Sequence, residues 1–299
     1  MDNILRRLGR GDIIVGDGAF GTMLMRRGLR QGSSPETVNL QAPELLEEVS
    51  SLYLEAGAEI VTTNSFGGSS LRLRHFQLEG EMERIDRVAV EAARKAVGDR
   101  AYVSGSVGPT ARLLKPFGDT GPEEIYESFR AQIEVLLGCG ADLVCIETMT
   151  DVAEAELAVR AAKDIRATVP VMASVTFEKN SRGFRTLMGT TIEDTARRLR
   201  QAGADIVGSN CGHGSDAMLA IAREFVQHAG IPVAIQSNAG LPVQSGDGLA
   251  YPETPEFFSG KAAEMLRLGV QIVGGCCGTT PEHIRAVRQA VDAHIQSAV

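Results

Sequence analysis

The chain has 299 residues, of which 43% are hydrophobic and 23% are charged, so it can bury a substantial core. Its formal net charge of −8 argues against nucleic acid or an anionic membrane as a partner, and no apolar run reaches the length of a membrane span. The charged N-terminal segment MDNILRRLGRGDIIV lacks a secretory apolar region, and five cysteines suit free or metal-bound thiols in a reducing cytosol, so we expect a cytoplasmic protein.

A short phrase recurs along the chain, as AGAEIV at 56–61, CGADLV at 139–144, AGADIV at 202–207 and LGVQIV at 268–273. In each phrase a helix is expected to end at the glycine, which suits the left-handed position after a helix. The apolar residues that follow suit a strand covered on both faces. Four further strands are predicted at 12–15, 101–107, 171–175 and 232–236.

Amphipathic helical segments alternate with these strands, at roughly 43–56, 80–97, 122–138, 151–167, 191–202, 215–229, 255–268 and 281–295. Strict alternation indicates a parallel sheet with right-handed crossovers, and eight repeats predict a (β/α)₈ barrel, as one domain over residues 1–299. A doubly wound open sheet is the structural alternative, although it seldom needs eight such even repeats. The longest irregular stretches, Phe177–Thr190 and Asn238–Thr254, both follow strands and are expected at the catalytic face.

Polar and thiol residues follow almost every predicted strand. In chain order the strand ends are Asp17-Gly18, Asn64-Ser65, Gly108-Pro109-Thr110, Glu147-Thr148, Thr176-Phe177, Asn210-Cys211, Asn238-Ala239 and Cys276-Cys277. Residues just past the strands of a barrel converge at its C-terminal mouth. We therefore expect the functional site at this mouth.

Three of the cysteines end two strands that are next-but-one neighbours around the predicted ring. Cys211 ends the sixth strand, and the adjacent Cys276 and Cys277 end the eighth. Three thiolates form a soft site that favours zinc, and three protein ligands leave one tetrahedral position open, which is typical of catalytic zinc. The alternative is that the three are incidental core thiols. Cys139 and Cys145 are expected to be inert small hydrophobes.

The segment GDGAFG at 16–21 fits the pattern G-x-G-x-x-G after a strand. A dinucleotide site would also require an acid at the end of the second strand about 20 residues on. The second strand instead ends at Asn64, which is much too far away. We therefore interpret these glycines as permitting close backbone approach to a ligand.

Taken together, the segments DGAFGTML, TTNSF, SVGPT, IETM, SNCG, NAGLP and GGCCGTTPEHI resemble the homocysteine S-methyltransferase family over nearly the whole chain. The resemblance implies a (β/α)₈ barrel, catalytic zinc held by Cys211, Cys276 and Cys277, and a thiol methyl acceptor, normally homocysteine. The chemistry is consistent, because a thiol is mostly protonated near neutral pH and zinc would hold it as a reactive thiolate.

The resemblance also implies partners for the amino-acid end of the substrate. Glu147 is expected to accept the α-ammonium group with help from Asp17, and the backbone N–H groups of Gly18 and Ala19 are expected to bind the α-carboxylate. Asn64 and Asn238 are expected to form hydrogen bonds around the site. Both asparagines have turn chemistry as their alternative explanation.

The methyl donor is less clearly indicated. Betaine and S-methylmethionine are cations that prefer an aromatic cage, and the chain has no tryptophan and only four tyrosines and ten phenylalanines. A methylcorrinoid needs no cage, but the nearest match to the corrinoid-binding pattern D-x-H-x-x-G is DAHIQS at 292–297, which lacks the glycine. We therefore favour methylcobalamin carried by a separate corrinoid protein.

Lys179, Arg182 and Arg185 form a basic segment that can steer an acidic partner, although a solvated loop is the commoner explanation.

Two alternatives stay open at this point. One is the same thiol chemistry with betaine or S-methylmethionine as the donor, or with a thiol other than homocysteine as the acceptor. The other belongs to a different class, a non-catalytic zinc-binding or thiol-binding protein on a barrel scaffold. The donor, the acceptor thiol and the oligomeric state do not follow from the sequence.

Overall fold

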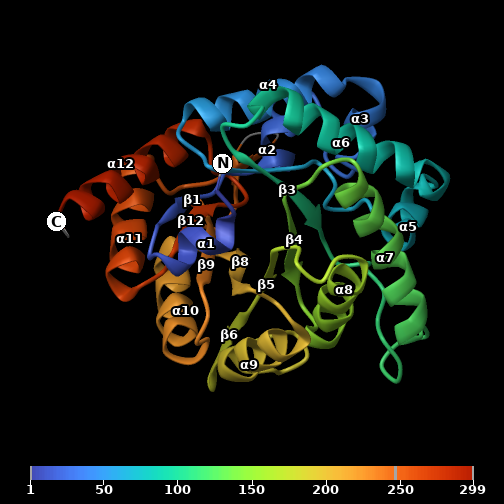
Figure 1. Cartoon of the computed structure of the whole chain (residues 1–299). Helices are drawn as coiled ribbons and strands as arrows, with labels where there is room; N and C mark the ends of the chain where they lie inside the picture. Colours follow the sequence, from blue (N-terminus) through green and yellow to red (C-terminus); the bar gives the residue numbers. More distant parts are fainter. Residues whose placement is uncertain (1, 246–247, 298–299) are drawn as a thin grey trace.

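A closed ring of parallel strands forms the centre of the molecule (Figure 1). The computed structural model describes residues 2–245 and 248–297. The strand order is β1-β12-β9-β8-β5-β4-β3-β2, and a parallel bridge between Gly16 and Ile60 joins the two outer strands. The strands are β1 (Ile14–Val15), β2 (Ile60–Thr62), β3 (Tyr102–Val107), β4 (Leu143–Met149), β5 (Val171–Val175), β8 (Ile206–Gly214), β9 (Val233–Asn238) and β12 (Ile272–Gly275). The predicted (β/α)₈ barrel is confirmed, and the open sheet is excluded.

The predicted helices surround this ring. They are α4 (Pro43–Glu55), α6 (Met82–Val97), α7 (Pro122–Gly138), α8 (Val152–Ile165), α9 (Ile192–Ala202), α10 (Ser215–His228), α11 (Pro255–Leu268) and α12 (Pro281–Ser297). The recurring phrase has the predicted conformation, because its glycines Gly57, Gly140, Gly203 and Gly269 all have φ between 99° and 110°. A side chain would be strained at these angles, so glycine ends each helix and turns the chain into the next strand.

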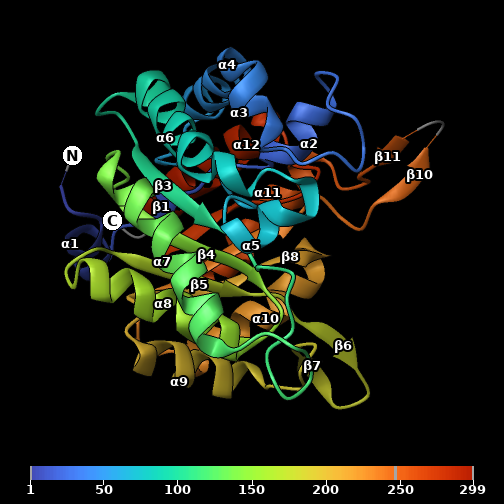
Figure 2. The same cartoon turned by 90° about the vertical axis from the view of Figure 1, so that its right-hand side faces the viewer.

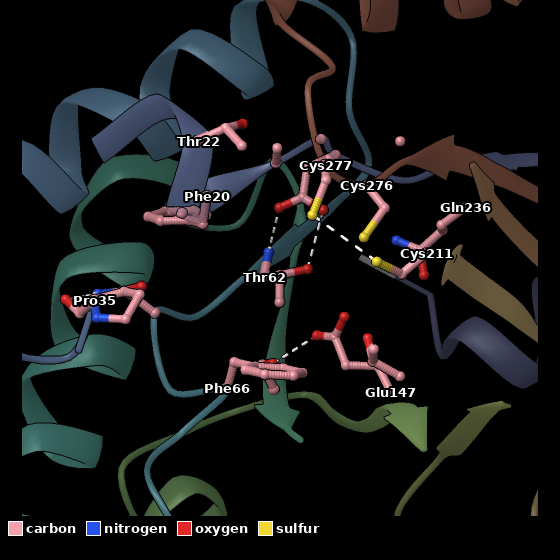
Figure 3. A pocket seen from close by; sticks show the side chains of 18 of the residues that line it. Phe20, Thr22, Pro35, Thr62, Phe66, Glu147, Cys211, Gln236, Cys276 and Cys277 are labelled. Carbon is pink, nitrogen blue, oxygen red and sulfur yellow. Dashed lines mark hydrogen bonds between the residues drawn. The ribbon is translucent and has the colours of Figure 1, made fainter. Parts of the chain in front are cut away.

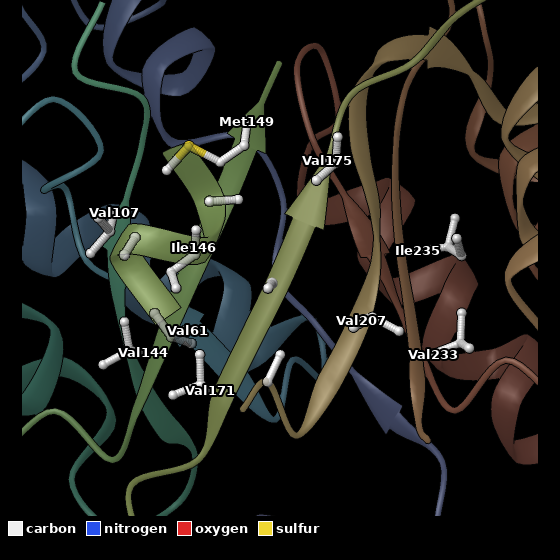
Figure 4. Packing of buried hydrophobic residues seen from close by; sticks show 14 of the residues in the cluster. Val61, Val107, Val144, Ile146, Met149, Val171, Val175, Val207, Val233 and Ile235 are labelled. Atoms are coloured by element: carbon white, nitrogen blue, oxygen red, sulfur yellow. The ribbon is translucent and has the colours of Figure 1, made fainter. Parts of the chain in front are cut away.

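Alternating side chains divide the core into two layers. Outward-facing residues such as Val61, Val144 and Val207 pack between the strands and the surrounding helices (Figure 4). Inward-facing residues such as Ile60 and Leu143 fill the N-terminal half of the barrel. The short helix α1 (Ile4–Gly9), which the sequence did not predict, packs Ile4 and Leu8 against this interior cluster. The N-terminal half of the barrel is therefore closed by apolar packing.

Further short helices lie between the main elements. They are α2 (Phe20–Met25), α3 (Thr37–Gln41) and α5 (Ser70–Leu73), with the 3₁₀ helices η1 (Arg74–Phe76) and η2 (Glu79–Glu81). Each is shorter than two turns, so none carries enough apolar periodicity to stand out in the sequence. Among the described residues, no helix is long and apolar enough to cross a membrane.

The two stretches expected to be irregular each contain a β-hairpin, which corrects that prediction. The first pairs β6 (Glu178–Asn180) with β7 (Gly183–Arg185), and the second pairs β10 (Val243–Ser245) with β11 (Gly248–Ala250). Both hairpins project from the same end of the barrel (Figure 2). Their strands are short and mostly exposed, so they lack the alternation of apolar and polar residues that predicts a half-buried strand.

Candidate active site

A cavity of about 360 Å³ opens at the C-terminal mouth of the barrel (Figure 3). Among the residues predicted to be functional, Asp17, Gly18, Ala19, Asn64, Glu147, Cys211, Cys276 and Cys277 all line it. These residues come from segments far apart in the chain. The expectation that the strand ends bring them together is confirmed.

The three predicted cysteine ligands converge at one side of this cavity. Their sulfur atoms all lie within 4.8 Å of one another, and the Sγ atoms of Cys211 and Cys277 are 3.9 Å apart. Tetrahedral Zn–S bonds of about 2.3 Å require sulfur atoms about 3.8 Å apart, so the spacing suits a metal ion. The backbone fixes the pair, because Cys276 N–H donates to the Ser237 carbonyl at 2.7 Å and the Cys277 carbonyl accepts from Ala239 N–H at 3.0 Å.

The protonation of this cluster also indicates a cation site. Hydrogen bonds with Cys276 and Cys277 lower the pKa of Cys211 to about 3. The neighbouring Cys211 thiolate in turn raises the pKa of Cys277 to about 12 and that of Cys276 well above its ordinary value. Ionisation of one thiol therefore opposes ionisation of the other two, and a nearby positive charge would offset that repulsion. A soft divalent cation supplies such a charge, and these residues fit one.

Glu147 lines the same cavity and lies below the sulfur atoms in the view of Figure 3. Its Oε1 accepts from the Ser106 hydroxyl at 2.6 Å, and its Oε2 accepts from the Asn210 side-chain amide at 3.1 Å. Burial raises the pKa of Glu147 to about 7. Both hydrogen-bond partners are neutral, so the carboxylate can still accept a cationic group from a ligand.

Asp17 is the second buried acid of the site. Its two carboxylate oxygens accept from the N–H of Thr62 at 2.6 Å and from the Thr62 hydroxyl at 3.0 Å. Burial, with a smaller contribution from the charge of Glu147, raises the pKa of Asp17 to about 7. Two carboxyl groups with raised pKa values in one cavity are typical of a binding site for a cationic ligand.

Comparison with known proteins decides the family. Residues 14–291 match the family model described as homocysteine S-methyltransferase. The chain belongs to the homocysteine S-methyltransferase family. It is 34% identical over 298 residues to the methionine synthases of Mycobacterium leprae and Mycobacterium tuberculosis, covering 93% of this chain but 24% of each relative. The chain therefore spans about a quarter of the length of these curated relatives.

A solved structure matches the chain over nearly the whole length of both proteins. The homocysteine methyltransferase MmuM from Escherichia coli, in its metallated form, superposes with a TM-score of 0.78 at 25% identity. The alignment covers 95% of this chain and 98% of MmuM. A methyltransferase from Methanosarcina mazei, 11% identical with a TM-score of 0.61, shares the fold alone.

Gly18 and Ala19, the expected carboxylate-binding residues, line the cavity next to other parts of the protein. Gly18 lines the cavity, but a side chain there would collide with the side chains of Thr279 and Tyr53, so its close approach is to the protein itself. The Ala19 N–H donates to the Thr279 hydroxyl at 3.1 Å. Binding of a substrate carboxylate by these N–H groups stays a prediction, and at Ala19 it requires the Thr279 hydroxyl to be displaced or shared.

The two predicted asparagines differ in their surroundings. Asn64 lines the cavity, but its amide nitrogen already donates to the Pro35 carbonyl at 2.9 Å and to the Asn39 side chain at 2.7 Å, which supports a structural role. Asn238 is not among the residues that line the cavity; its side chain helps to lower the pKa of Cys211, and its Oδ1 is buried without a hydrogen-bond partner in the described part of the chain. Asn238 therefore belongs to the surroundings of the sulfur cluster.

Several residues in or next to this cavity were not predicted. Phe20, Phe66 and Gln236 line the cavity, and Asn210 contacts both Glu147 and Cys276. Tyr251, from the loop after β11, packs its ring on Gly278, where a Cβ would lie 2.0 Å from a ring carbon. Asn210 had a usable signal, since it directly precedes Cys211 at a strand end. The others depend on how segments far apart in the chain meet.

Proposed function

We propose that this chain methylates the thiol of L-homocysteine to give methionine, with zinc held by Cys211, Cys276 and Cys277. The observation that carries this proposal is a single cavity lined both by three converging thiols and by the acid Glu147. An amino acid with a thiol at one end and an ammonium group at the other carries the two groups that these residues can bind. A zinc ion supplies the positive charge that keeps a substrate thiol deprotonated.

The residues of the chain then have separable tasks. Glu147, with Asp17 nearby, accepts hydrogen bonds from the α-ammonium group and so fixes the substrate in one orientation. Ser106 and Asn210 hold the Glu147 carboxylate in place. The substrate sulfur is thereby directed toward an incoming methyl group. In the transfer, a sulfur lone pair forms the new S–C bond while the bond between the methyl carbon and its donor breaks.

We further propose that the methyl donor is methylcobalamin carried by a separate corrinoid protein. A protein donor needs a docking surface, and the loops at the mouth expose large apolar side chains, with Phe117 at 73%, Leu187 at 67% and Leu241 at 56% exposure. Exposed apolar groups at the rim of a site are typical of a protein contact. The methionine synthase relatives are also about four times longer than the matched segment, which leaves room for other domains in those proteins.

A second donor class is favoured by a different observation. Phe20 and Phe66 both line the cavity, and their rings can face a small cationic donor such as S-methylmethionine or betaine.

Turnover assays separate these donors. Zinc-loaded protein is given L-homocysteine with methylcobalamin (free or protein-bound), with S-methylmethionine or with betaine, and methionine is measured. We expect methionine from methylcobalamin and none from betaine. Robust betaine turnover without a corrinoid would contradict methylcobalamin as the donor. It would leave the proposed thiol chemistry unchanged. Binding of zinc and homocysteine with no turnover from any donor would favour the non-catalytic alternative.

A further inference from the structure

Asn210, midway along β8 where the pairing with β9 shifts register, connects two parts of the proposed site. It is 1% exposed and directly precedes Cys211. Its Oδ1 accepts from the Thr148 N–H at 2.7 Å. Its Nδ2 lies 2.8 Å from Thr148 Oγ1, 3.1 Å from Glu147 Oε2 and 3.8 Å from Cys276 Sγ. A single buried amide therefore contacts the acid of one strand end and a sulfur of another.

The backbone on both sides of this amide adopts an uncommon conformation. Thr148 and Cys211 have φ of 58° and 59°, in the left-handed region that non-glycine residues rarely occupy. The pairing of β4 with β5 and of β8 with β9 also shifts register at these two points. Such conformations persist only where the surroundings enforce them. The bond from the Thr148 N–H to the Asn210 side chain supplies that enforcement for β4.

Glu147 has a second hydrogen-bond partner that offers a comparison. Ser106, on β3, donates to Oε1, and the structure gives it no contact with the three cysteines. Asn210 alone among the described residues is hydrogen-bonded both to Glu147 and to a cysteine of the cluster. Asn210 and Ser106 therefore differ in that only Asn210 connects Glu147 to the sulfur atoms.

We propose that Asn210 is a positioning residue that fixes Glu147 relative to the sulfur cluster and thereby sets the length of the thiol amino acid that the site accepts. This inference rests on the proposed function. A substrate held by its ammonium group at Glu147 and by its sulfur at the cluster must span a fixed separation. Homocysteine is one methylene longer than cysteine, so a rigid separation selects between them and a loose one does not.

The test compares Asn210→Ala with Ser106→Ala in zinc-loaded protein, using calorimetric titration with L-homocysteine and L-cysteine. We expect Asn210→Ala to weaken homocysteine binding and to reduce the preference for homocysteine over cysteine by about tenfold. Ser106→Ala should weaken both thiols alike and keep the preference. In cobalt-substituted protein, Asn210→Ala should shift the sulfur-to-cobalt charge-transfer band because a hydrogen bond to Cys276 is lost, and Ser106→Ala should leave the band in place.

A second variant separates positioning from simple support of the fold. In Asn210→Ala/Thr148→Gly, glycine adopts the positive φ without strain, so the melting temperature should recover while the preference for homocysteine should not. An Asn210→Ala protein with the parent preference and the parent cobalt spectrum would overturn the inference, as would recovery of the preference in the double variant. Failure of the parent zinc-loaded protein to bind homocysteine would instead overturn the proposed function.

Discussion

The two ends of the barrel differ in whether their acids are paired with a cation. At the N-terminal end, Glu59 pairs one oxygen with Arg7 at 2.7 Å and the other with Arg288 at 2.8 Å, tying α1 and α12 to the start of β2. At the mouth, Glu147 and Asp17 accept only from neutral groups, and no cation of the described residues pairs with them. A paired acid contributes to stability, whereas unpaired acids with raised pKa values indicate a place for a cationic ligand.

The largest expected effect is at the sulfur cluster. Cys276→Ala should abolish methyl transfer and remove most bound zinc, because two remaining thiols cannot complete a three-ligand site. Zinc content by atomic absorption and methionine formation measure the two effects. Cys145→Ala is the matched control, since Cys145 is buried in the barrel interior outside the cluster and should keep about one zinc per chain. Full activity in Cys276→Ala would contradict the proposed metal site.

The next effect concerns the acid at the mouth. Glu147→Gln keeps the shape of the side chain but removes the charge that faces the substrate ammonium group. Loss of a charge-assisted hydrogen bond costs roughly 1.5–3 kcal/mol, so homocysteine affinity should fall about 10- to 150-fold. Calorimetric titration measures this loss. An unchanged dissociation constant would exclude Glu147 as the ammonium partner.

The matching Glu-to-Gln change at the N-terminal end of the barrel should lower stability and leave substrate binding unchanged. Glu59→Gln leaves Arg7 and Arg288 without their anionic partner, so unfolding free energy should fall by about 1.5–3 kcal/mol. Homocysteine affinity should stay within twofold of the parent because Glu59 lies far from the mouth along the barrel. Urea denaturation and calorimetry measure the two quantities. If Glu59→Gln weakened binding as much as Glu147→Gln, the two ends would not be functionally distinct.

The sequence predicts the barrel on which this contrast rests, but not the ion pairs of Glu59. The recurring glycine phrase and the buried apolar runs are local signals, so the eight strands and the main helices follow from them. The convergence of Cys211, Cys276 and Cys277 could be predicted because strand ends converge at the mouth of any such barrel. The network at the mouth did not follow, because Asn210 lies 63 residues from Glu147 and 66 from Cys276. The hairpins β6–β7 and β10–β11 were missed because their exposed strands carry no apolar alternation.

The raised pKa of Glu147 also predicts how stability depends on pH. The folded protein retains a proton on Glu147 up to about pH 7, whereas the unfolded chain loses it near 4.5. The folded state therefore binds more protons between these values, and the stability gained from the neutral acid is lost as pH rises through that window. Denaturation of metal-free, substrate-free protein at pH 5 and pH 7.5 measures this loss. Glu147→Gln should reduce the decrease, and an identical pH dependence in both proteins would contradict the assignment.

The smallest expected effect concerns the rim of the mouth and the proposed protein donor. Arg182 is exposed at the turn of the β6–β7 hairpin, which projects from the mouth, on a chain whose net charge is −8. Charges at the rim of an interface change association rates more than the contacts formed afterwards. Arg182→Glu should therefore slow association with an acidic corrinoid protein several-fold and flatten its salt dependence. Zinc and homocysteine affinities should not change.

A control at a distant surface makes this last effect specific. Arg223→Glu makes the same change in net charge on α10, in the ring of helices outside the barrel, and should leave the association rate nearly as in the parent. Stopped-flow mixing at low and high salt measures both variants. If both variants slowed association equally, the association rate would depend on the total charge of the chain alone. Electrostatic steering toward the mouth instead requires the position of the charge to matter. Slowing by Arg182→Glu alone would place the donor contact at the hairpin, at the same end of the barrel as the unpaired acids.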